Sequence, residues 1–267
     1  MDLKYQVEKI LGKNRRASKL TQYKNKGQIR RFCDLVQKKY GLQKINHLKT
    51  KHTRGVFEDL KEEGLSPSTL ASYGTAARAI AQAISKQNIV PRSNRELGIS
   101  RAGDRLKPVM ADMEKIHDLT AQLYKKDEWL GLAAELRENF GLRAKESLLS
   151  TGVANGKLIV RGSKGGRPRE IPIRNKSQRE LLNRVQDHLK REGKTSLIPS
   201  NMNLMQGLKC QSNAIHRLGG TKDNNAHPHS SRHAYAQDLY RQGNAPQNIA
   251  EELGHGRTEI VSHYIPK

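Results

Sequence analysis

The stretch that decides the fold is KLIVRGSKGGRPREIPI, residues 157–173. Its two ends are short runs rich in β-branched residues, and the Gly-Gly pair between them is typical of a turn. The stretch therefore predicts a β-hairpin. Most of the remaining chain has helical periodicity instead. We expect a mainly α fold with a small antiparallel β hairpin or sheet, which places the chain in the α+β class.

On both sides of the hairpin, apolar residues recur every three or four positions, which predicts helices. Their ranges are 110–124, 128–140, 176–191, 231–242, 246–253 and 258–264, with three further helices between residues 17 and 87. Ser66 and Pro67 mark the start of one of these three, because serine can cap free amides and proline lacks the donor that is unused there. Residues 197–225 are too irregular to assign.

The composition indicates a folded protein with a polyanionic partner. The 267 residues include 49 Lys and Arg against 26 Asp and Glu, a formal net charge of +23, while 35% of residues are hydrophobic. Such a surplus repels itself unless a polyanion neutralises it, and nucleic acid is the leading candidate. Only 4% of residues are aromatic, which favours duplex DNA over a base-stacked single strand. A ribosome-associated or merely soluble basic protein is the alternative.

The charge is concentrated in the first part of the chain. Residues 1–110 carry 24 Lys and Arg against 9 Asp and Glu, and residues 111–267 carry 25 against 17. We expect a helical DNA-binding domain over residues 1–90, an aperiodic linker over 91–110 and a second domain over 111–267. No apolar run reaches the ~18 to 20 residues that span a bilayer, and no signal-peptide core follows Met1. The expected location is the cytoplasm, associated with the nucleoid.

Basic side chains between the apolar stripes of the first domain are candidates for phosphate contacts. They are Lys24, Lys26, Arg30, Lys38, Lys39, Lys49, Lys51 and Arg54. For any one of them the alternative is a solvated cation. In the hairpin, Arg161, Arg167 and Arg169 are expected to contact phosphate or to be solvated charges.

Histidine is unevenly distributed, with five of the ten in residues 227–267. A zinc site is the first explanation to consider, but no cysteine lies among them and no pair follows a helical metal-binding pattern. Glu251 and Glu252 are adjacent on a predicted helix and face different directions, as expected of a solvated surface. Cys33 and Cys210 are too few for a disulfide framework. We therefore expect no metal and no other cofactor.

Four short motifs stand in order along the second domain. They are Gly141-Leu142-Arg143-Ala144-Lys145-Glu146, His229-Ser230-Ser231-Arg232, Leu253-Gly254-His255 and Tyr264. The combination resembles the tyrosine recombinase (phage integrase) family, and the intervals of 86, 23 and 9 residues between successive key residues agree with it. The resemblance covers residues 111–267 and, through helix pattern alone, residues 1–100. It implies a two-domain, C-shaped clamp around duplex DNA.

The resemblance also implies a role for each matching residue. Arg143, His229, Arg232 and His255 would act on the scissile phosphate, and Tyr264 would be the nucleophile. Lys164 lies eight residues before Pro172, the offset of the catalytic lysine that relatives carry on this hairpin loop. Glu146 would be an orienting or structural partner. His227, His233 and His263 match no position that carries chemistry.

The chemistry of these residue types is consistent with that reading. Arginine offers two donors to the charge that develops on phosphate oxygens and keeps its proton, so two arginines can replace a metal ion. Tyrosine has an ordinary pKa of about 10 and needs a cationic pocket or a base such as His229. Attack would leave a 3′-phosphotyrosine and a 5′-hydroxyl, to which Lys164 would give a proton. Tyr235 and Tyr240 compete with Tyr264, but helix packing explains both.

We expect a site-specific recombinase that integrates or excises a mobile element. The alternatives are a resolvase of DNA dimers, a topoisomerase-like relaxing enzyme and a non-catalytic DNA-binding regulator. The expected partners are double-stranded DNA, further copies in a tetramer on paired sites, and an accessory DNA-bending or directionality factor. Only three residues follow Tyr264, whereas many relatives continue into a helix that docks on the adjacent protomer. Either the chain is cut short or another surface couples the subunits.

Overall fold

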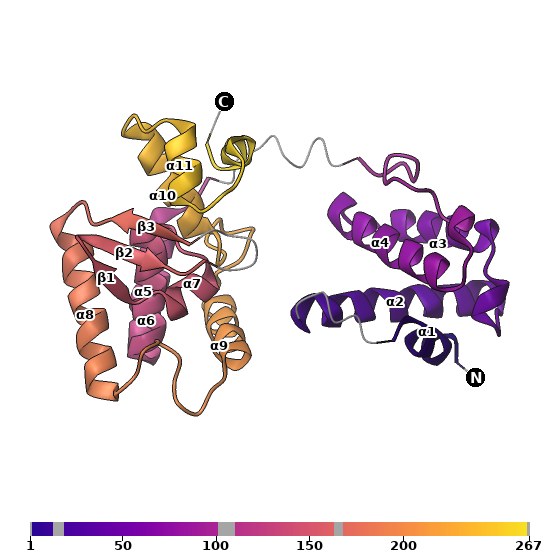
Figure 1. The fold of residues 1–267 in the computed structure, drawn as a ribbon, viewed down its shortest axis with the longest axis horizontal. Coiled ribbons are helices and arrows are strands. Elements are labelled where there is room, and N and C mark those ends of the chain that lie inside the picture. The colour runs from indigo at the N-terminus through magenta and orange to yellow at the C-terminus, as the bar shows by residue number, and fades with distance from the viewer. Residues whose placement is uncertain (1, 13–18, 101–109, 163–167, 266–267) are drawn as a thin grey trace. The chain divides into compact units, whose positions relative to one another are not determined.

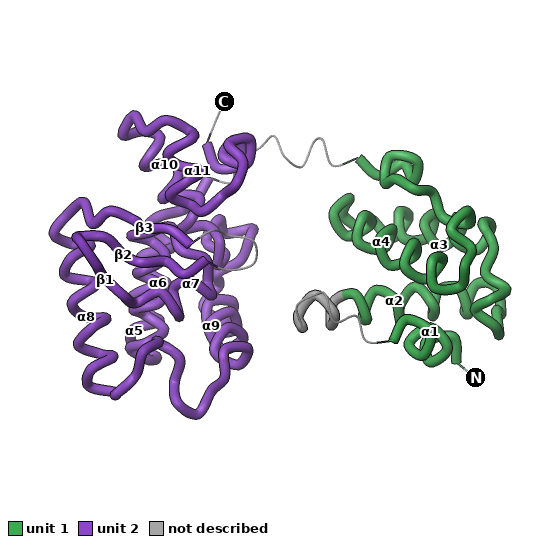
Figure 2. The backbone as a smooth tube through the Cα atoms, viewed as in Figure 1, with its two compact units in different colours: residues 1–104 green, residues 105–267 purple. Residues whose placement is uncertain are grey.

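The computed structural model of the chain describes residues 2–12, 19–100, 110–162 and 168–265, with the backbone alone for residues 19–24. The chain divides into two compact units, residues 1–104 and 105–267, shown in Figure 2. Each unit buries apolar residues in a core of its own. None of the described helices combines the length and the apolar character that crossing a membrane requires.

The described part of the first unit is helical (Figure 1). Its helices are α1 (Leu3–Leu11), α2 (Lys19–Tyr40), α3 (Thr50–Glu62) and α4 (Pro67–Ala83), with 3-10 turns η1 (Ile45–His47) and η2 (Gln87–Ile89). Phe32, Leu60 and Ile80 bring α2, α3 and α4 together in a core from which solvent is excluded. These three helices confirm the prediction. Helix α1 was not predicted, because only Leu3 and Val7 of its residues are buried and two positions make no period.

The cap of α4 follows its sequence signal. The Ser66 hydroxyl accepts a hydrogen bond from the Thr69 amide at 3.3 Å, and Pro67 is the first helical residue. The predicted start of this helix is confirmed.

The second unit packs helices around a small sheet (Figure 1). The helices are α5 (Met113–Lys126), α6 (Glu128–Phe140), α7 (Ala144–Leu149), α8 (Lys176–Glu192), α9 (Leu204–Arg217), α10 (Ser230–Arg241), α11 (Pro246–Glu252) and the 3-10 helix η4 (Thr258–His263). The strands are β1 (Gly152–Ala154), β2 (Lys157–Val160) and β3 (Arg169–Pro172), antiparallel in the order β1-β2-β3. Leu158 of β2 lies opposite Ile171 of β3, and both are fully buried in the core that includes residues of α6 and α8. The mainly α class and the hairpin are confirmed.

Four elements of the second unit differ from the predictions. Helix α7 lies outside every predicted helical range, because six residues are too few to show a helical period. Helix α9 occupies part of the stretch left unassigned, although Asn203 caps it by accepting from the Met205 and Gln206 amides at 3.0 Å each. Strand β1 has three residues, all exposed, and therefore lacks an alternating pattern. The last predicted helix is the 3-10 helix η4, whose turns are tighter than those of an α-helix.

A glycine turn after α6 directs the chain toward the site. Gly141 has φ +58°, a left-handed conformation that ends the helix. A Cβ at this position would lie 2.5 Å from Cδ1 of Tyr235, so glycine is also required by the close approach of α10. The chain continues directly into Leu142 and Arg143, the residue before α7.

Candidate active site

Four of the predicted catalytic residues meet at one place, although they come from three separate parts of the second unit. Arg232 lies in the first turn of α10, His255 follows α11, and Tyr264 follows η4. Nη2 of Arg232 lies 3.1 Å from Nε2 of His255, and the same nitrogen of His255 lies 3.2 Å from the Tyr264 hydroxyl. The ring of His229, the residue before α10, has its centroid 6.4 Å from that of Tyr264. The structure therefore brings these four residues together around the Tyr264 ring.

Arg232 is the buried centre of the cluster, with 1% of its surface exposed. Nη1 donates to the Gly141 carbonyl at 2.6 Å and Nη2 donates to the Leu253 carbonyl, so the side chain joins the end of α6 to the end of α11. Its guanidinium carbon lies 5.9 Å from the centroid of the Tyr264 ring. Burial lowers the pKa of Arg232 to about 10, which leaves it charged at neutral pH. A permanent cation therefore lies beside the phenol.

The histidine beside Tyr264 is held in its neutral form. Burial and the cation of Arg232 lower the pKa of His255 to about 4. Arginine has no acceptor, so Nε2 of His255 must accept at that contact, and the proton of the neutral ring resides on Nδ1. The nitrogen that faces the Tyr264 hydroxyl is therefore unprotonated, and its one lone pair is shared with the donor of Arg232.

Two more histidines of α10 and its cap surround the phenol. Surrounding protein atoms partly bury the ring of His229, and Arg232 adds a nearby positive charge. Both effects lower the pKa of His229 to about 3, although part of the residue stays exposed to solvent. His233 lies one helical turn further on, and its ring centroid is 4.7 Å from that of Tyr264. Burial and the neighbouring His227 lower the pKa of His233 to about 4. Sequence reasoning assigned His233 no role, yet its spacing of four from His229 puts both on one helix face.

Arg143 lies at the edge of this cluster and is tied to Glu146. The Glu146 carboxylate accepts from the Arg143 amide at 2.9 Å and from its Nη1 at 2.8 Å. Glu146 is buried, whereas 24% of the Arg143 side chain is exposed. Burial opposes ionisation of Glu146, but the hydrogen bonds and charges of Arg169 and Arg143 outweigh it and lower the pKa to about 2. Glu146 is thus a buried carboxylate with hydrogen bonds to both Arg143 and Arg169.

The expectation for Arg169 was wrong. It is neither a solvated charge nor placed for contact with DNA: only 6% of its side chain is exposed, and Nη2 lies 3.0 Å from Oε2 of Glu146. The alternation of side chains along a β-strand could have predicted the burial of Arg169. Arg169 lies two residues from the fully buried Ile171 and therefore on the same face of β3.

The competing tyrosines have other surroundings. Tyr235 is buried on α10, donates its hydroxyl hydrogen to Glu252 and accepts from Arg174 at 3.2 Å. Burial and the Glu252 carboxylate raise its pKa far above the usual range, which makes it a poor nucleophile. The packing explanation fails for Tyr240, which is 43% exposed. The expectation of a solvated Glu252 is also wrong, because Arg174 donates two hydrogen bonds to its carboxylate.

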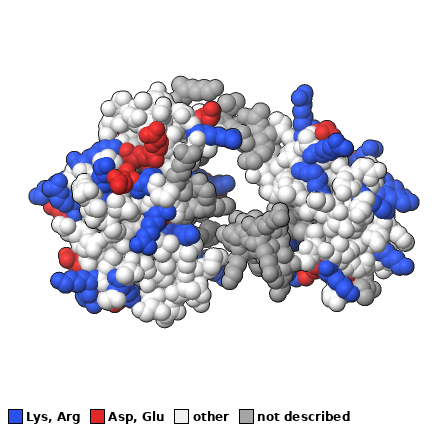
Figure 3. Space-filling view, viewed as in Figure 1, with Lys and Arg blue, Asp and Glu red and all other residues white. Residues whose placement is uncertain are grey.

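Several predicted DNA contacts of the first unit reach the surface. Lys49, Lys51 and Arg54 are exposed on and before α3. Lys26 and Arg30 of α2 are exposed as well, but both lie near Glu8 of α1, at 4.0 Å and 2.6 Å. The side chain of Lys24, together with Lys164 and Arg167, lies outside the described residues. Figure 3 shows one face of the molecule, on which basic side chains of both units reach the surface and acidic ones are few.

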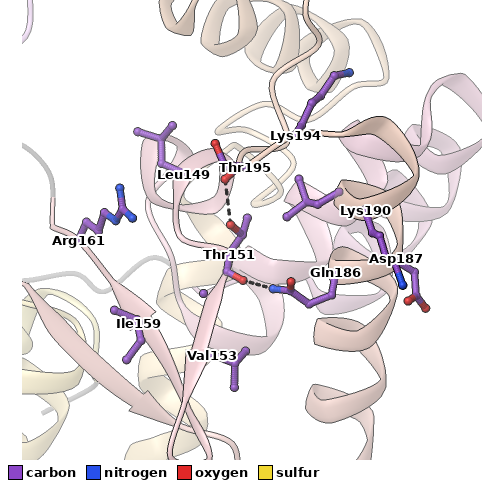
Figure 4. Close-up of a pocket in the computed structure, with 12 residues that line it drawn as sticks. Leu149, Thr151, Val153, Ile159, Arg161, Gln186, Asp187, Lys190, Lys194 and Thr195 are labelled. Carbon is purple, nitrogen blue, oxygen red and sulfur yellow. Dashed lines mark hydrogen bonds between the residues drawn. The ribbon is translucent and has the colours of Figure 1, made fainter.

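An open pocket of about 630 Å³ lies elsewhere on the second unit, between β1, β2 and α8 (Figure 4). Arg161, Lys190 and Lys194 bring positive charge to it, and Gln186 donates to the Thr151 carbonyl at its base. None of the predicted catalytic residues that the structure describes lines this pocket. Among the residues that the structure describes, no group of three His, Cys, Asp or Glu side chains is arranged to hold a metal ion.

Comparison with known proteins shows the family and the fold of the chain. Residues 110–267 match the model of the phage integrase family. XerH site-specific recombinase, in a post-cleavage complex with palindromic difH substrate, has the same fold, with a TM-score of 0.69, 19% identity and coverage of 98% of this chain and 80% of that chain. A lambda integrase tetramer bound to a Holliday junction has a TM-score of 0.66 and 17% identity, with coverage of 98% of this chain and 75% of that chain. The Tn1549 transposon integrase in complex with transposon right end DNA has a TM-score of 0.60 and 16% identity, with coverage of 99% of this chain and 94% of that chain.

A search of curated protein sequences gives no significant match. The family model nevertheless covers more than half of the chain, including every motif of the second domain. The chain belongs to the phage integrase family of tyrosine recombinases.

Proposed function

We propose that the chain is a site-specific recombinase that cleaves one strand of duplex DNA with Tyr264, holds it as a 3′-phosphotyrosine and rejoins it to another strand. The observation that carries the proposal is the position of His255 Nε2, 3.2 Å from the Tyr264 hydroxyl and 3.1 Å from Arg232. A phenol, a base able to take its proton and a permanent cation meet there. This combination suits nucleophilic attack without a metal ion.

In the first step the Tyr264 oxygen attacks the scissile phosphorus and its proton passes to His255. Nε2 of neutral His255 lies within hydrogen-bonding distance of the hydroxyl, and it takes the proton as it gives up its hydrogen bond from Arg232. The guanidinium carbon of Arg232 lies 5.9 Å from the centroid of the Tyr264 ring, so a positive charge is close to the attacking residue. Arg143 and Arg232 are the proposed donors to the non-bridging oxygens, and His229 at the exposed side of the cluster is a third. The partly exposed Arg143 is accessible to a phosphate.

The P–O5′ bond breaks as the P–O bond to Tyr264 forms, and the leaving 5′-oxygen needs a proton. We assign this role to Lys164, by its offset from Pro172 and by resemblance to the family. The phosphoryl group stays bonded to Tyr264, so a 5′-hydroxyl from a second strand can reverse the step. Strand exchange then requires neither a nucleotide nor a metal cofactor.

The DNA partner is proposed to contact both units. Lys49, Lys51 and Arg54 present exposed cations in the first unit, which suits contact with a duplex backbone. We propose the same organisation into domains as the sequence suggested, with residues 1–90 binding DNA and residues 111–267 carrying out cleavage. A lambda integrase relative forms a tetramer on a Holliday junction, and we propose a tetramer on paired sites here.

We further propose that the reaction integrates or excises a mobile element in the cytoplasm, assisted by a DNA-bending or directionality factor. Sequencing the DNA beside the gene tests this role. Flanking direct repeats at the ends of an element are expected. A single short palindromic site, with no element boundaries, would instead indicate resolution of DNA dimers.

The central experiment uses a nicked duplex that carries the flanking repeat, on which a covalent protein–DNA adduct accumulates. Wild-type protein is expected to form the adduct, and Tyr264→Phe is expected to form none while binding the duplex with unchanged affinity. Tyr240→Phe is the matched control, because this tyrosine is exposed on α10 and should leave adduct formation intact. An adduct with Tyr264→Phe would show that another residue is the nucleophile. Failure of the wild type would favour a non-catalytic regulator.

A salt titration tests the DNA partner separately from chemistry. Each phosphate that the protein neutralises releases counterions, so the logarithm of the affinity should fall linearly with the logarithm of the salt concentration. We expect a slope of magnitude about 5 or more from several phosphate contacts. A flat response would contradict a binding surface built on lysine and arginine.

A further inference from the structure

The carboxylate of Glu146 is shared by two arginines that engage it in different ways. Arg169 approaches as a fork, with Nη1 at 3.3 Å from Oε1 and Nη2 at 3.0 Å from Oε2. Arg143 approaches with Nη1 alone, at 2.8 Å from Oε1. All but 6% of the Arg169 side chain is buried, whereas Arg143 lies at the surface of the cluster. The two arginines are therefore not equivalent: one is a buried counter-ion and the other is partly open.

This division leaves donors of Arg143 available. A buried carboxylate strongly favours a bidentate arginine, since two parallel hydrogen bonds satisfy both of its oxygens. Arg169 already supplies such a fork, so Arg143 contributes a single side-chain bond. Without Arg169, Arg143 would be the nearest of the described arginines to the charged Glu146, because Arg232 Nη1 lies 4.0 Å away. Arg143 would then be drawn into the fork position that Arg169 now occupies.

Arg169 also fixes the segment that carries His255. Its Nε donates to the Glu252 carbonyl at 2.5 Å, at the end of α11. Gly254 permits this approach: a Cβ there would lie 2.8 Å from Nη1 of Arg169 and 3.2 Å from its Cδ and Cζ. The glycine of the Leu253-Gly254-His255 motif is thus explained by a side chain from β3. The hairpin, the start of α7 and the end of α11 meet at one guanidinium.

We propose that Arg169 is a positioning residue for strand cleavage, which occupies Glu146 so that Arg143 remains free to bind the scissile phosphate. The inference rests on the proposed function and adds to it. Arg169 touches neither the phosphate nor Tyr264. Its effect passes through Arg143, and the substitution that removes its charge should slow cleavage without weakening DNA binding.

The test compares wild type with the single variant Arg169→Gln and with the double variant Glu146→Gln/Arg169→Gln. Arg179→Gln is the matched control, because Arg179 is an exposed arginine of α8 with no role in the proposed site. In single-turnover cleavage of the nicked duplex, Arg169→Gln should be slower than wild type by at least about tenfold, since misplacing a catalytic group by about 1 Å can cost a hundredfold. Its Kd for DNA should change by less than about twofold, because the phosphate contacts elsewhere dominate affinity. Arg179→Gln should cleave at the wild-type rate.

The double variant separates positioning from folding. With Glu146 also neutral, no carboxylate competes for Arg143, and cleavage should recover part of the loss. Each variant is compared at a temperature at which thermal unfolding shows it fully folded. If Arg169→Gln cleaves like wild type, or if the double variant is slower than Arg169→Gln at equal folding, the proposal is overturned.

A second measurement does not depend on cleavage. Phenylglyoxal modifies accessible arginines, and peptide mass spectrometry gives the extent at Arg143. Arg143 should be modified in wild type, protected in Arg169→Gln and modified again in the double variant. If wild type forms no adduct but this pattern appears, the proposed function fails while the positioning of Arg143 by Arg169 stands. Equal modification in all three proteins would refute the positioning role.

Discussion

The neutral histidines around Tyr264 predict a loss of stability in mild acid. His255 has an ordinary pKa of 6.5 in an unfolded chain and one of about 4 in the fold, where burial and Arg232 disfavour its protonation. The unfolded state therefore takes up the proton first as the pH falls. The contribution of neutral His255 to the free energy of unfolding is fully present above pH 6.5. It is lost progressively as the pH falls from 6.5 to about 4, the pKa of His255 in the fold.

The magnitude follows from the two pKa values. At pH 5 an unfolded histidine is almost fully protonated, while the folded His255 is about one-tenth protonated. The free energy of unfolding is therefore about 2 kcal/mol lower at pH 5 than at pH 8. Glu146, with a pKa of about 2, is ionised in the fold throughout this range. The variant His255→Asn lacks the titrating group and should lose about 2 kcal/mol less than wild type between pH 8 and pH 5.

The assay is urea unfolding at both pH values, followed by the fluorescence of Trp129. This is the only tryptophan of the chain and is buried in α6, so it reports on the second unit. The comparison of wild type with His255→Asn cancels the titration of all groups that the two proteins share. His47→Gln, at an exposed histidine of the first unit, is the control and should behave as wild type. If the pH dependence of His255→Asn equals that of wild type, the reasoning from burial and charge is refuted.

Three further predictions concern packing and burial. A Cβ at Gly131 would lie 2.2 to 2.5 Å from ring carbons of Tyr124, whose hydroxyl is bonded to Glu135 and Arg184, so Gly131→Ala should lower the free energy of unfolding by about 1–3 kcal/mol. Gly152→Ala, with nothing within 4 Å, should be close to neutral in the same urea assay. Arg137 of α6 is 3% exposed and its Nε has no hydrogen-bond partner among the described residues, so Arg137→Met should raise the free energy of unfolding by about 1–4 kcal/mol, and a decrease would contradict this reasoning. Burial raises the pKa of Cys33 to about 12, so a disulfide reagent should leave it unmodified until the first unit unfolds, and rapid labelling of the native protein would contradict this.

Much of the fold could be predicted from local pattern. Helices α4 and α6 have clear boundaries in the sequence, since Ser66 caps one and Gly141 ends the other in a left-handed turn. The hairpin follows from two β-rich runs around glycines. Helix α9 was missed although Asn203 caps it, because its apolar positions are interrupted by polar residues and the cap alone does not predict a helix.

The candidate site was also predictable from the sequence only in part. The family resemblance implied that Arg232, His255 and Tyr264 act on one phosphate, and in the structure His255 lies within hydrogen-bonding distance of both Arg232 and Tyr264. Spacing does not tell how deep a side chain lies. That Arg232 is almost completely buried follows from the packing of α6, α10 and α11 around it. The same packing lowers the pKa values of the histidines, which no motif encodes.

The sequence by itself determined the fold class, the family resemblance and the identity of the residues proposed for catalysis, because periodicity, caps and motif spacing depend only on the order of residues along the chain. Only the tertiary structure decided which charges are paired. Arg169 and Glu146 lie 23 residues apart on β3 and α7, and Arg169 reaches the Glu252 carbonyl 83 residues away. Whether a charge is solvated or holds a partner depends on the surfaces that packing removes from water, and these surfaces are set by the whole chain at once.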